Sequence, residues 1–182
     1  MPKVPVNLAS GEWYCEEKID GHRLIVEVTH GGPDPGSPSN GAFVDGTPRH
    51  VKAWSRNGLS RILPEHLIME LVKLPEGIYD GELHAPGKRS YGVTEIENGP
   101  ELVYTVFDIL QSTHVGDMMD YPYRVRRTAL SLAVPKIDGP VRHGWAFIVN
   151  TQEELTRYLT NIWEQDGEGV ILKHAESVYS PA

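Results

Sequence analysis

The sequence predicts an α+β fold in which antiparallel sheets are flanked by helices. Short runs of alternating apolar and polar residues, bounded by Gly, Pro, Asn and Asp, indicate strands, and several neighbouring runs can pair as hairpins. Segments with apolar residues at helical spacing lie between these runs. Because strands and helices are mixed in this way, we expect largely antiparallel sheets. No shift in composition marks a second domain within the 182 residues.

Four strands are expected in the first third of the chain. Residues 12–18 form a short strand that ends at the Asp20-Gly21 turn. Residues 23–29 form a second strand, because its apolar residues alternate and share one face. Its hairpin partner is expected at 50–55, across a loop at 30–48 that is rich in Gly, Pro and Ser and carries a short strand at 42–44.

The rest of the chain is expected to alternate between helices and strands. One helix begins at Pro64, a residue that favours the first helical position, and another begins at the capping box of Thr151 and Glu154. The expected helices span residues 64–73, 121–133 and 151–163. The remaining strands are expected at 77–83, 102–110, 144–150 and 169–173.

Composition and charge exclude several classes of protein. The formal net charge is −8, which argues against a generally basic nucleic-acid binder but allows a local basic face. A single cysteine, Cys15, permits no internal disulfide and favours a reducing compartment. No apolar run approaches the roughly 18 residues of a membrane span, and the N-terminus lacks a secretion signal. We therefore expect a cytoplasmic protein, in the nucleoid or a host cytosol if viral, that is neither secreted nor membrane-bound.

Five short islands combine charged or aromatic residues with strand ends and turns, where functional residues collect. They are 16–23 (EEKIDGHR), 55–58 (SRNG), 80–83 (DGEL), 106–110 (VFDIL) and 168–173 (EGVILK). The period of a strand places Glu16 and Lys18 on one face. The same period places Asp80 and Glu82 on one face of their strand. Gly21, Gly81 and Gly169 leave room for backbone turns or for close approach of a ligand.

In content, order and approximate spacing, the islands resemble those of the covalent nucleotidyltransferase superfamily, and of ATP-dependent DNA ligases most closely. The SRNG and FDIL forms favour DNA ligases over capping enzymes. The resemblance implies that residues 1–182 form an ATP-grasp-like adenylation domain. It also implies ATP and Mg²⁺, or Mn²⁺, as cofactors and nicked duplex DNA as the partner.

The resemblance assigns the covalent step to Lys18, which would attack the α-phosphorus of ATP and form a lysine–AMP intermediate. Only the neutral amine is nucleophilic, and an unperturbed lysine has a pKa of about 10.4. Desolvation or nearby positive charge has to lower this pKa. Arg23, Lys173 and a metal ion could supply that charge.

The other roles also follow from the resemblance. Glu16 would accept a hydrogen bond from the adenine amino group, and Phe107 would stack on the base. Arg23 and Arg56 would contact the nucleotide or, later, the DNA phosphate. Lys173 would help to offset the phosphate charge.

Glu82 and Glu168 would bind the metal ion, since carboxylate oxygens suit Mg²⁺, and Glu82 would also contact the ribose. The spacing of the last island conflicts with this role, because Glu168 and Lys173 are five residues apart. An ideal strand would point them to opposite faces. Both reach one site only if Glu168 lies at a bend or the strand bulges.

Family members continue into a further strand with a Lys-x-Lys element and then into an OB-fold domain. We therefore expect a domain that is truncated before the last lysine strand, and an OB-fold domain in the full-length enzyme. The alternatives are an RNA ligase or capping-type guanylyltransferase, and a non-catalytic nucleotide- or DNA-binding fragment. A basic, aromatic stretch at 121–127 is interpreted as a solvated helix face in preference to a DNA contact.

Overall fold

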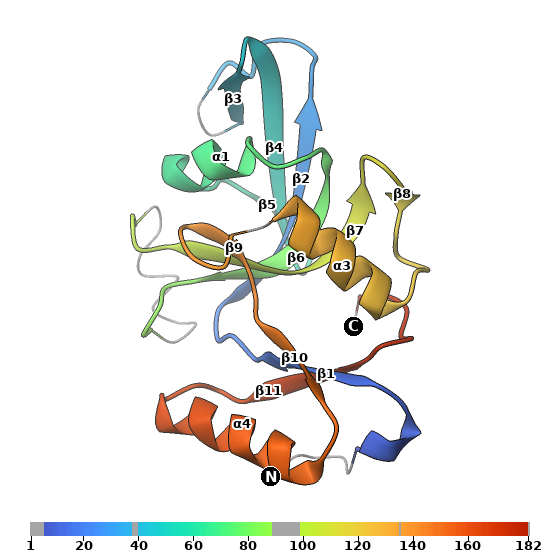
Figure 1. Ribbon diagram of the computed structural model, residues 1–182. Coiled ribbons are helices and arrows are strands. Elements are labelled where there is room, and N and C mark those ends of the chain that lie inside the picture. The colour runs from blue at the N-terminus through green and yellow to red at the C-terminus, as the bar shows by residue number, and fades with distance from the viewer. Residues whose placement is uncertain (1–5, 38–39, 89–98, 135, 182) are drawn as a thin grey trace.

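Two β-sheets form the frame of this computed structural model (Figure 1), which describes residues 6–37, 40–88, 99–134 and 136–181. The large sheet has the order β3-β4-β2-β6-β7-β8, with β5 paired to β4 and β9 paired to β7. Its strands are β2 (His22–His30), β3 (Gly41–Val44), β4 (Thr47–Ser55), β5 (Ser60–Arg61), β6 (Gly77–His84), β7 (Val103–Ser112), β8 (Gly116–Asp117) and β9 (Val141–His143).

The small sheet has the order β10-β1-β11. Its strands are β1 (Trp13–Glu17), β10 (Ala146–Val149) and β11 (Val170–His174). The helices are α1 (Glu65–Leu71), α3 (Tyr123–Ala133) and α4 (Gln152–Glu164), with a 3-10 turn η1 at Leu8–Ser10. The pairings are antiparallel except for that of β7 with β9, so the expected α+β fold with antiparallel sheets is confirmed.

The main core lies against the large sheet. Leu24, Val26 and Val28 alternate along β2, as expected, and each is at most 2% exposed. They belong to the same buried cluster as Leu67 and Leu71 of α1. Burial of such side chains stabilises the sheet by roughly 1.5–3 kcal/mol each. The large sheet is therefore a rigid support for the side chains at the ends of its strands.

The small sheet is covered on one face by α4 (Figure 1). The Thr151 hydroxyl accepts from the backbone N–H of Glu154 at 3.2 Å, and the Glu154 carboxylate accepts from the N–H of Asn150 at 2.8 Å. The expected capping box is therefore present, with its return bond displaced by one residue. Cys15 of β1 and Leu155 of α4 lie in a second, smaller buried cluster.

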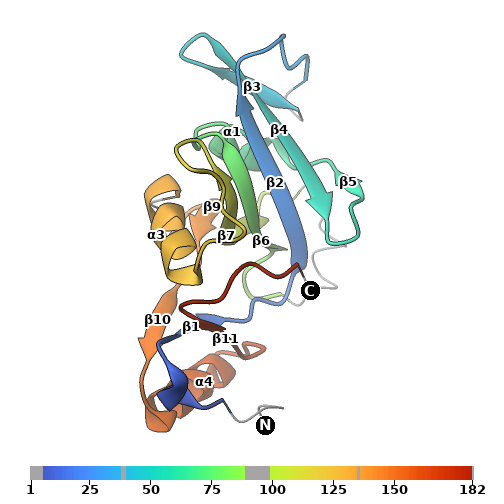
Figure 2. The ribbon, with the colours of Figure 1, turned by 90° about the vertical axis from the view of Figure 1, so that its right-hand side faces the viewer.

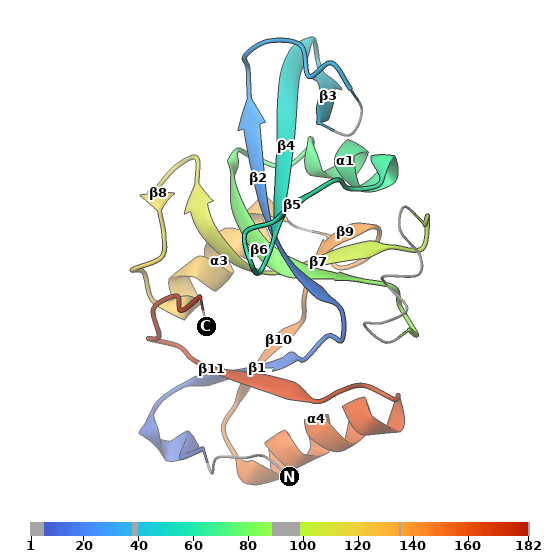
Figure 3. The same ribbon diagram turned by 180° about the vertical axis from the view of Figure 1, so that it is seen from behind.

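The chain crosses between the two sheets directly after β1. Residues 18–21 lead from β1 in the small sheet to β2 in the large one, so the turn at Asp20-Gly21 does not close a hairpin (Figure 2). The segment after β11 returns in the opposite direction (Figure 3), and the N–H of Tyr179 bonds to the carbonyl of Met119 at 2.9 Å. Together with residues 144–145, which lead from β9 to β10, three segments therefore cross between the two sheets.

The expected strands and helices are present, with ends that differ by a few residues. The short strands β5, β8 and β9 were not expected, because two or three residues carry no measurable periodicity. Within the described ranges, no helix has both the length and the apolar character needed to cross a membrane.

Candidate active site

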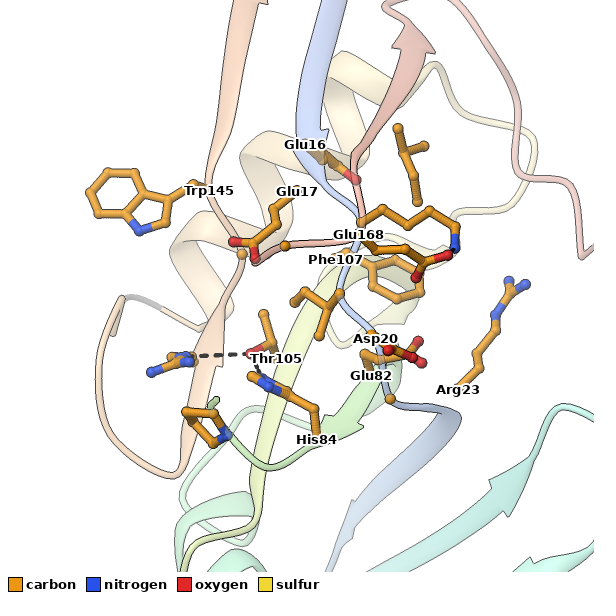
Figure 4. A pocket seen from close by; sticks show the side chains of 18 of the residues that line it. Glu16, Glu17, Asp20, Arg23, Glu82, His84, Thr105, Phe107, Trp145 and Glu168 are labelled. Atoms are coloured by element: carbon orange, nitrogen blue, oxygen red, sulfur yellow. Dashed lines mark hydrogen bonds and ion pairs between the residues drawn. The ribbon is translucent and has the colours of Figure 1, made fainter. Parts of the chain in front are cut away.

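A cleft of about 1110 Å³ lies between the sheets, and residues of both sheets form its walls (Figure 4). Residues 18–21 and the turns that follow β4 and precede β11 close its margins. All eight residues singled out from the sequence line it: Glu16, Lys18, Arg23, Arg56, Glu82, Phe107, Glu168 and Lys173. The fold thus brings together side chains that are up to 157 positions apart in the chain.

Lys18 lies one residue beyond β1, at the point where the chain leaves the small sheet. The backbone N–H of Lys18 donates to the backbone carbonyl of Gly169 at 2.9 Å, which holds the lysine backbone against the turn before β11. Its ammonium group forms an ion pair with the Glu168 carboxylate. Both side chains are partly exposed, at 47% and 37%, so the pair is accessible from the cleft.

The geometry before β11 resolves the conflict over the last island. Glu168 lies outside the strand. Gly169 has a φ of 154°, a backbone conformation that residues other than glycine rarely adopt. This bend turns Glu168 into the cleft, while Lys173 reaches the same cleft from within β11. The bend expected for this site is present.

Arg23 is held in place by a buried carboxylate. Its Nε and Nη2 donate to the two oxygens of Asp80 at 3.1 and 2.7 Å, and Asp80 is fully buried. The Tyr179 hydroxyl donates to Asp80 Oδ2 at 2.7 Å and accepts from Arg23 Nη2 at 2.9 Å. Hydrogen bonding to Asp80 raises the pKa of the Arg23 guanidinium, which stays positive beside the cleft.

Glu82 lies opposite Arg23 across the β2–β6 pairing and lines the cleft. Burial, with a smaller contribution from the charge of Asp80, raises the pKa of the Glu82 carboxyl to about 7. The positive charges of Arg23 and Lys18 oppose this shift. Glu82 is therefore a carboxyl group whose ionisation depends strongly on added positive charge nearby.

Around Glu16, the cleft combines acidic, basic and aromatic side chains. Glu16 is only 5% exposed, accepts a hydrogen bond from the Tyr123 hydroxyl, and lies 2.9 Å from the ammonium of Lys173. Burial raises the pKa of Glu16, and Lys173 acts against this. The Lys173 ammonium also lies 4.9 Å from the centre of the Phe107 ring. A flat face, a hydrogen-bond acceptor and a donor thus meet at one place.

Residues 2–182 match the family model described as the ATP dependent DNA ligase domain. The chain belongs to this family of ligase domains. The match covers nearly the whole chain.

Solved structures of DNA ligases share the fold of this ligase domain. They include the bacteriophage T7 ATP-dependent ligase in complex with ATP, with a TM-score of 0.64, 16% identity and coverage of 95% of this chain and 60% of that one. The Chlorella virus DNA ligase-adenylate has a TM-score of 0.62 and 18% identity, and the match covers 99% of this chain and 61% of that one. The ligase domain of M. tuberculosis LigD has a TM-score of 0.62 and 21% identity, and the match covers 94% of this chain and 50% of that one. The chain thus spans between half and about three fifths of the length of these structures.

Sequence reasoning missed two tyrosines that shape this ligase-domain site. Tyr123 bonds to Glu16, and Tyr179 bonds to Arg23 and Asp80. Neither lies in one of the five islands, and no local pattern connects them with residues more than 100 positions away. Asp80 and Glu82 were expected to share one face of a strand, but only Glu82 lines the cleft, while Asp80 is buried and bonded to Arg23.

The interpretation of residues 121–127 as a solvated helix face is wrong for two of its members. Tyr123 and Arg126 are buried, at 0% and 2% exposure. Arg126 donates two hydrogen bonds to Asp108, at 2.8 and 3.0 Å. Asp108 directly follows Phe107, so Arg126 supports the strand residue next to the aromatic wall of the cleft.

Proposed function

We propose that this ligase domain transfers AMP from ATP to its own Lys18, as the first step in sealing nicked DNA. The observation that carries the proposal is the position of Lys18 at the junction of the two sheets. From there the amine faces a cleft that also contains several carboxyl groups, an aromatic ring and fixed positive charges. A lysine placed for covalent chemistry needs such an environment, whereas a surface lysine does not.

In this step the neutral amine of Lys18 attacks the α-phosphorus of ATP. A P–N bond forms, the bond to the β-phosphate oxygen breaks, and pyrophosphate leaves with the electron pair. The amine loses a proton to solvent or to a nearby base. Glu168 pairs with the ammonium form of Lys18 and is in a position to accept that proton. If Glu168 instead binds another partner, the ion pair is broken and the amine is released.

The nucleotide would occupy the cleft with its base at the Phe107 end. Phe107 offers a ring face for stacking, and Glu16 offers an acceptor for the adenine amino group. Lys173, Arg23 and Arg56 would offset the phosphate charge.

Glu82 and Glu168 are the residues that would hold Mg²⁺ or Mn²⁺. In the described part of the chain, no three His, Cys, Asp or Glu side chains are grouped closely enough to form a protein-only metal site. Two cleft carboxylates, completed by water and phosphate oxygens, fit the way in which Mg²⁺ is held in nucleotide sites. The ion would neutralise phosphate charge and favour the ionised form of Glu82.

In the complete reaction, AMP would pass from Lys18 to a 5′-phosphate at a nick, and the 3′-hydroxyl would then displace it. We propose that an OB-fold domain assists closure around the DNA, as the family resemblance implies. The single buried cysteine supports a reducing compartment such as the cytosol.

Intact-mass analysis after incubation with Mg²⁺ and ATP tests the first step. The wild-type chain is expected to gain one AMP, and Lys18→Ala is expected to gain none. Lys73→Ala is the matched control, because Lys73 also forms an exposed ion pair but lies outside the cleft. An adduct from GTP in place of ATP would favour the capping-type alternative. ATP binding without any adduct would favour a non-catalytic nucleotide-binding fragment.

A further inference from the structure

The hydroxyl of Tyr179 closes a ring of hydrogen bonds with Arg23 and Asp80. It donates to Asp80 Oδ2 at 2.7 Å and accepts from Arg23 Nη2 at 2.9 Å. The same Nη2 donates to Asp80 Oδ2 at 2.7 Å. A guanidinium Nη carries two hydrogens, so Nη2 makes both of its bonds at once. The three side chains therefore hold one another in a single arrangement.

Tyr179 is itself held in place by the region around α3. Its backbone N–H donates to the carbonyl of Met119 at 2.9 Å, and its ring lies 5.9 Å from the guanidinium carbon of Arg126. Arg126 also donates to the carbonyl of Ser177 at 3.1 Å. Burial and the hydrogen bond to Asp80 raise the pKa of the Tyr179 hydroxyl, so the hydroxyl keeps the proton that it donates.

The orientation of Arg23 matters because its guanidinium faces the aromatic wall of the cleft. The guanidinium carbon lies 5.9 Å from the centre of the Phe107 ring (Figure 4). Arg23 and Tyr179 both line the cleft, whereas Asp80 does not. An arginine side chain has several rotatable bonds, so a guanidinium held by Asp80 alone would keep some freedom to pivot. The Tyr179 hydroxyl removes this freedom by occupying the second hydrogen of Nη2.

We propose that Tyr179 is a positioning residue for AMP transfer, whose hydroxyl fixes the Arg23 guanidinium in the direction that the phosphates of ATP require. Tyr179 acts through Arg23 and makes no bond to the nucleotide. Charged groups that are fixed before the reaction stabilise the transition state most effectively, and a displacement of about 1 Å costs roughly 100-fold in rate. The inference rests on the proposed function and adds to it a residue that lies outside the five islands.

The rate of AMP transfer to Lys18, followed by intact mass at several ATP concentrations, tests this role. Tyr179→Phe removes the hydroxyl and keeps the ring. Its rate at saturating ATP is expected to fall about 10- to 100-fold. The half-saturating ATP concentration should change by less than about threefold, because the groups at the base end of the cleft are intact. Tyr79→Phe is the matched control and should keep the wild-type rate. It also loses a hydroxyl, which donates to the carbonyl of Pro75 at 2.7 Å, but Tyr79 lies outside the cleft.

A double variant separates positioning from a general loss of structure. In an Arg23→Lys background, Tyr179→Phe should slow the transfer by less than about twofold, because the guanidinium that the hydroxyl orients is already gone. Losses of equal size in the two backgrounds would overturn the inference. So would equal rates for the wild type and Tyr179→Phe, or a change in the half-saturating ATP concentration alone. A wild type that forms no adduct would instead overturn the proposed function and this inference with it, so the two failures are distinguishable.

Discussion

Arg126 of α3 and Asp108 of β7 form a buried ion pair with two hydrogen bonds, at 2.8 and 3.0 Å. The same guanidinium donates to the carbonyls of Tyr121 and Ser177, at 2.5 and 3.1 Å. One side chain therefore connects the strand that carries Phe107, the start of the helix, and the segment that leads to Tyr179.

Replacement of Arg126 by Met should lower the free energy of unfolding by about 3–5 kcal/mol. The reason is that the Asp108 carboxylate would stay buried without its partner. Urea denaturation followed by circular dichroism measures the effect. The double variant Arg126→Met, Asp108→Asn should recover part of the loss, because the unpaired charge is then gone. A cost below about 1 kcal/mol for the single variant would contradict this account.

The stability of the chain should depend on pH through Glu82. Its pKa is raised to about 7 from a usual value of 4.5, so the folded state keeps a proton that the unfolded state has released between these values. The Glu82 contribution to stability is therefore present below about pH 4.5 and is lost as pH rises through 7.

Glu82→Gln should remove this dependence. The stability of the variant relative to the wild type should therefore be higher at pH 8 than at pH 5, by roughly 2 kcal/mol after allowance for solvent screening. Urea denaturation of both proteins at the two pH values, in the absence of divalent cations, gives the comparison. Parallel pH profiles for the wild type and the variant would show that Glu82 titrates normally.

Cys15 should resist alkylation in the folded protein. The thiol is 2% exposed in the small core, and burial raises its pKa to about 11. Since the thiolate is the reactive form, iodoacetamide at pH 8 should modify Cys15 only when the chain unfolds. Mass spectrometry with and without urea distinguishes the two states. Rapid labelling without denaturant would mean that the small sheet opens readily.

Gly81→Ala should destabilise the large sheet by about 1–3 kcal/mol. An added Cβ would lie 2.5 Å from the carbonyl oxygen of Thr105, in the paired strand β7, and 2.7 Å from the Tyr104 ring, which lies in the main core. Gly144→Ala is the comparison, because its nearest contact is 3.3 Å from a Thr105 methyl group. A shift in thermal midpoint that is larger for Gly144→Ala than for Gly81→Ala would be inconsistent with this steric argument.

Local patterns in the sequence predicted most of the strands and singled out residues that the fold places in one cleft. The alternation of Leu24, Val26 and Val28 placed β2 correctly, because a half-buried strand must show such a period. The site residues were predictable because each lies in a short island with its own chemistry. Their common position in one cleft is confirmed by the fold, while their individual roles remain predictions.

Contacts between distant parts of the chain could not be predicted. The division into two sheets depends on which strands pair, and β1 pairs with β10 and β11 rather than with its neighbour β2. The bonds of Tyr123 and Tyr179 join residues 107 and 156 positions apart. No periodicity or spacing rule specifies pairs at such separations, because they result from the packing of whole elements.

The bond between Arg23 and Tyr179 has a consequence for the order of events during synthesis. Arg23 leaves the ribosome long before its hydroxyl partner, which follows 156 residues later. At translation rates of about 5–20 residues per second, the delay is roughly 8–30 seconds. Lys18 waits for Glu168 over a similar interval. A nascent chain would therefore complete its large core, whose last member is Val141, before its cleft, which also needs Glu168, Lys173 and Tyr179.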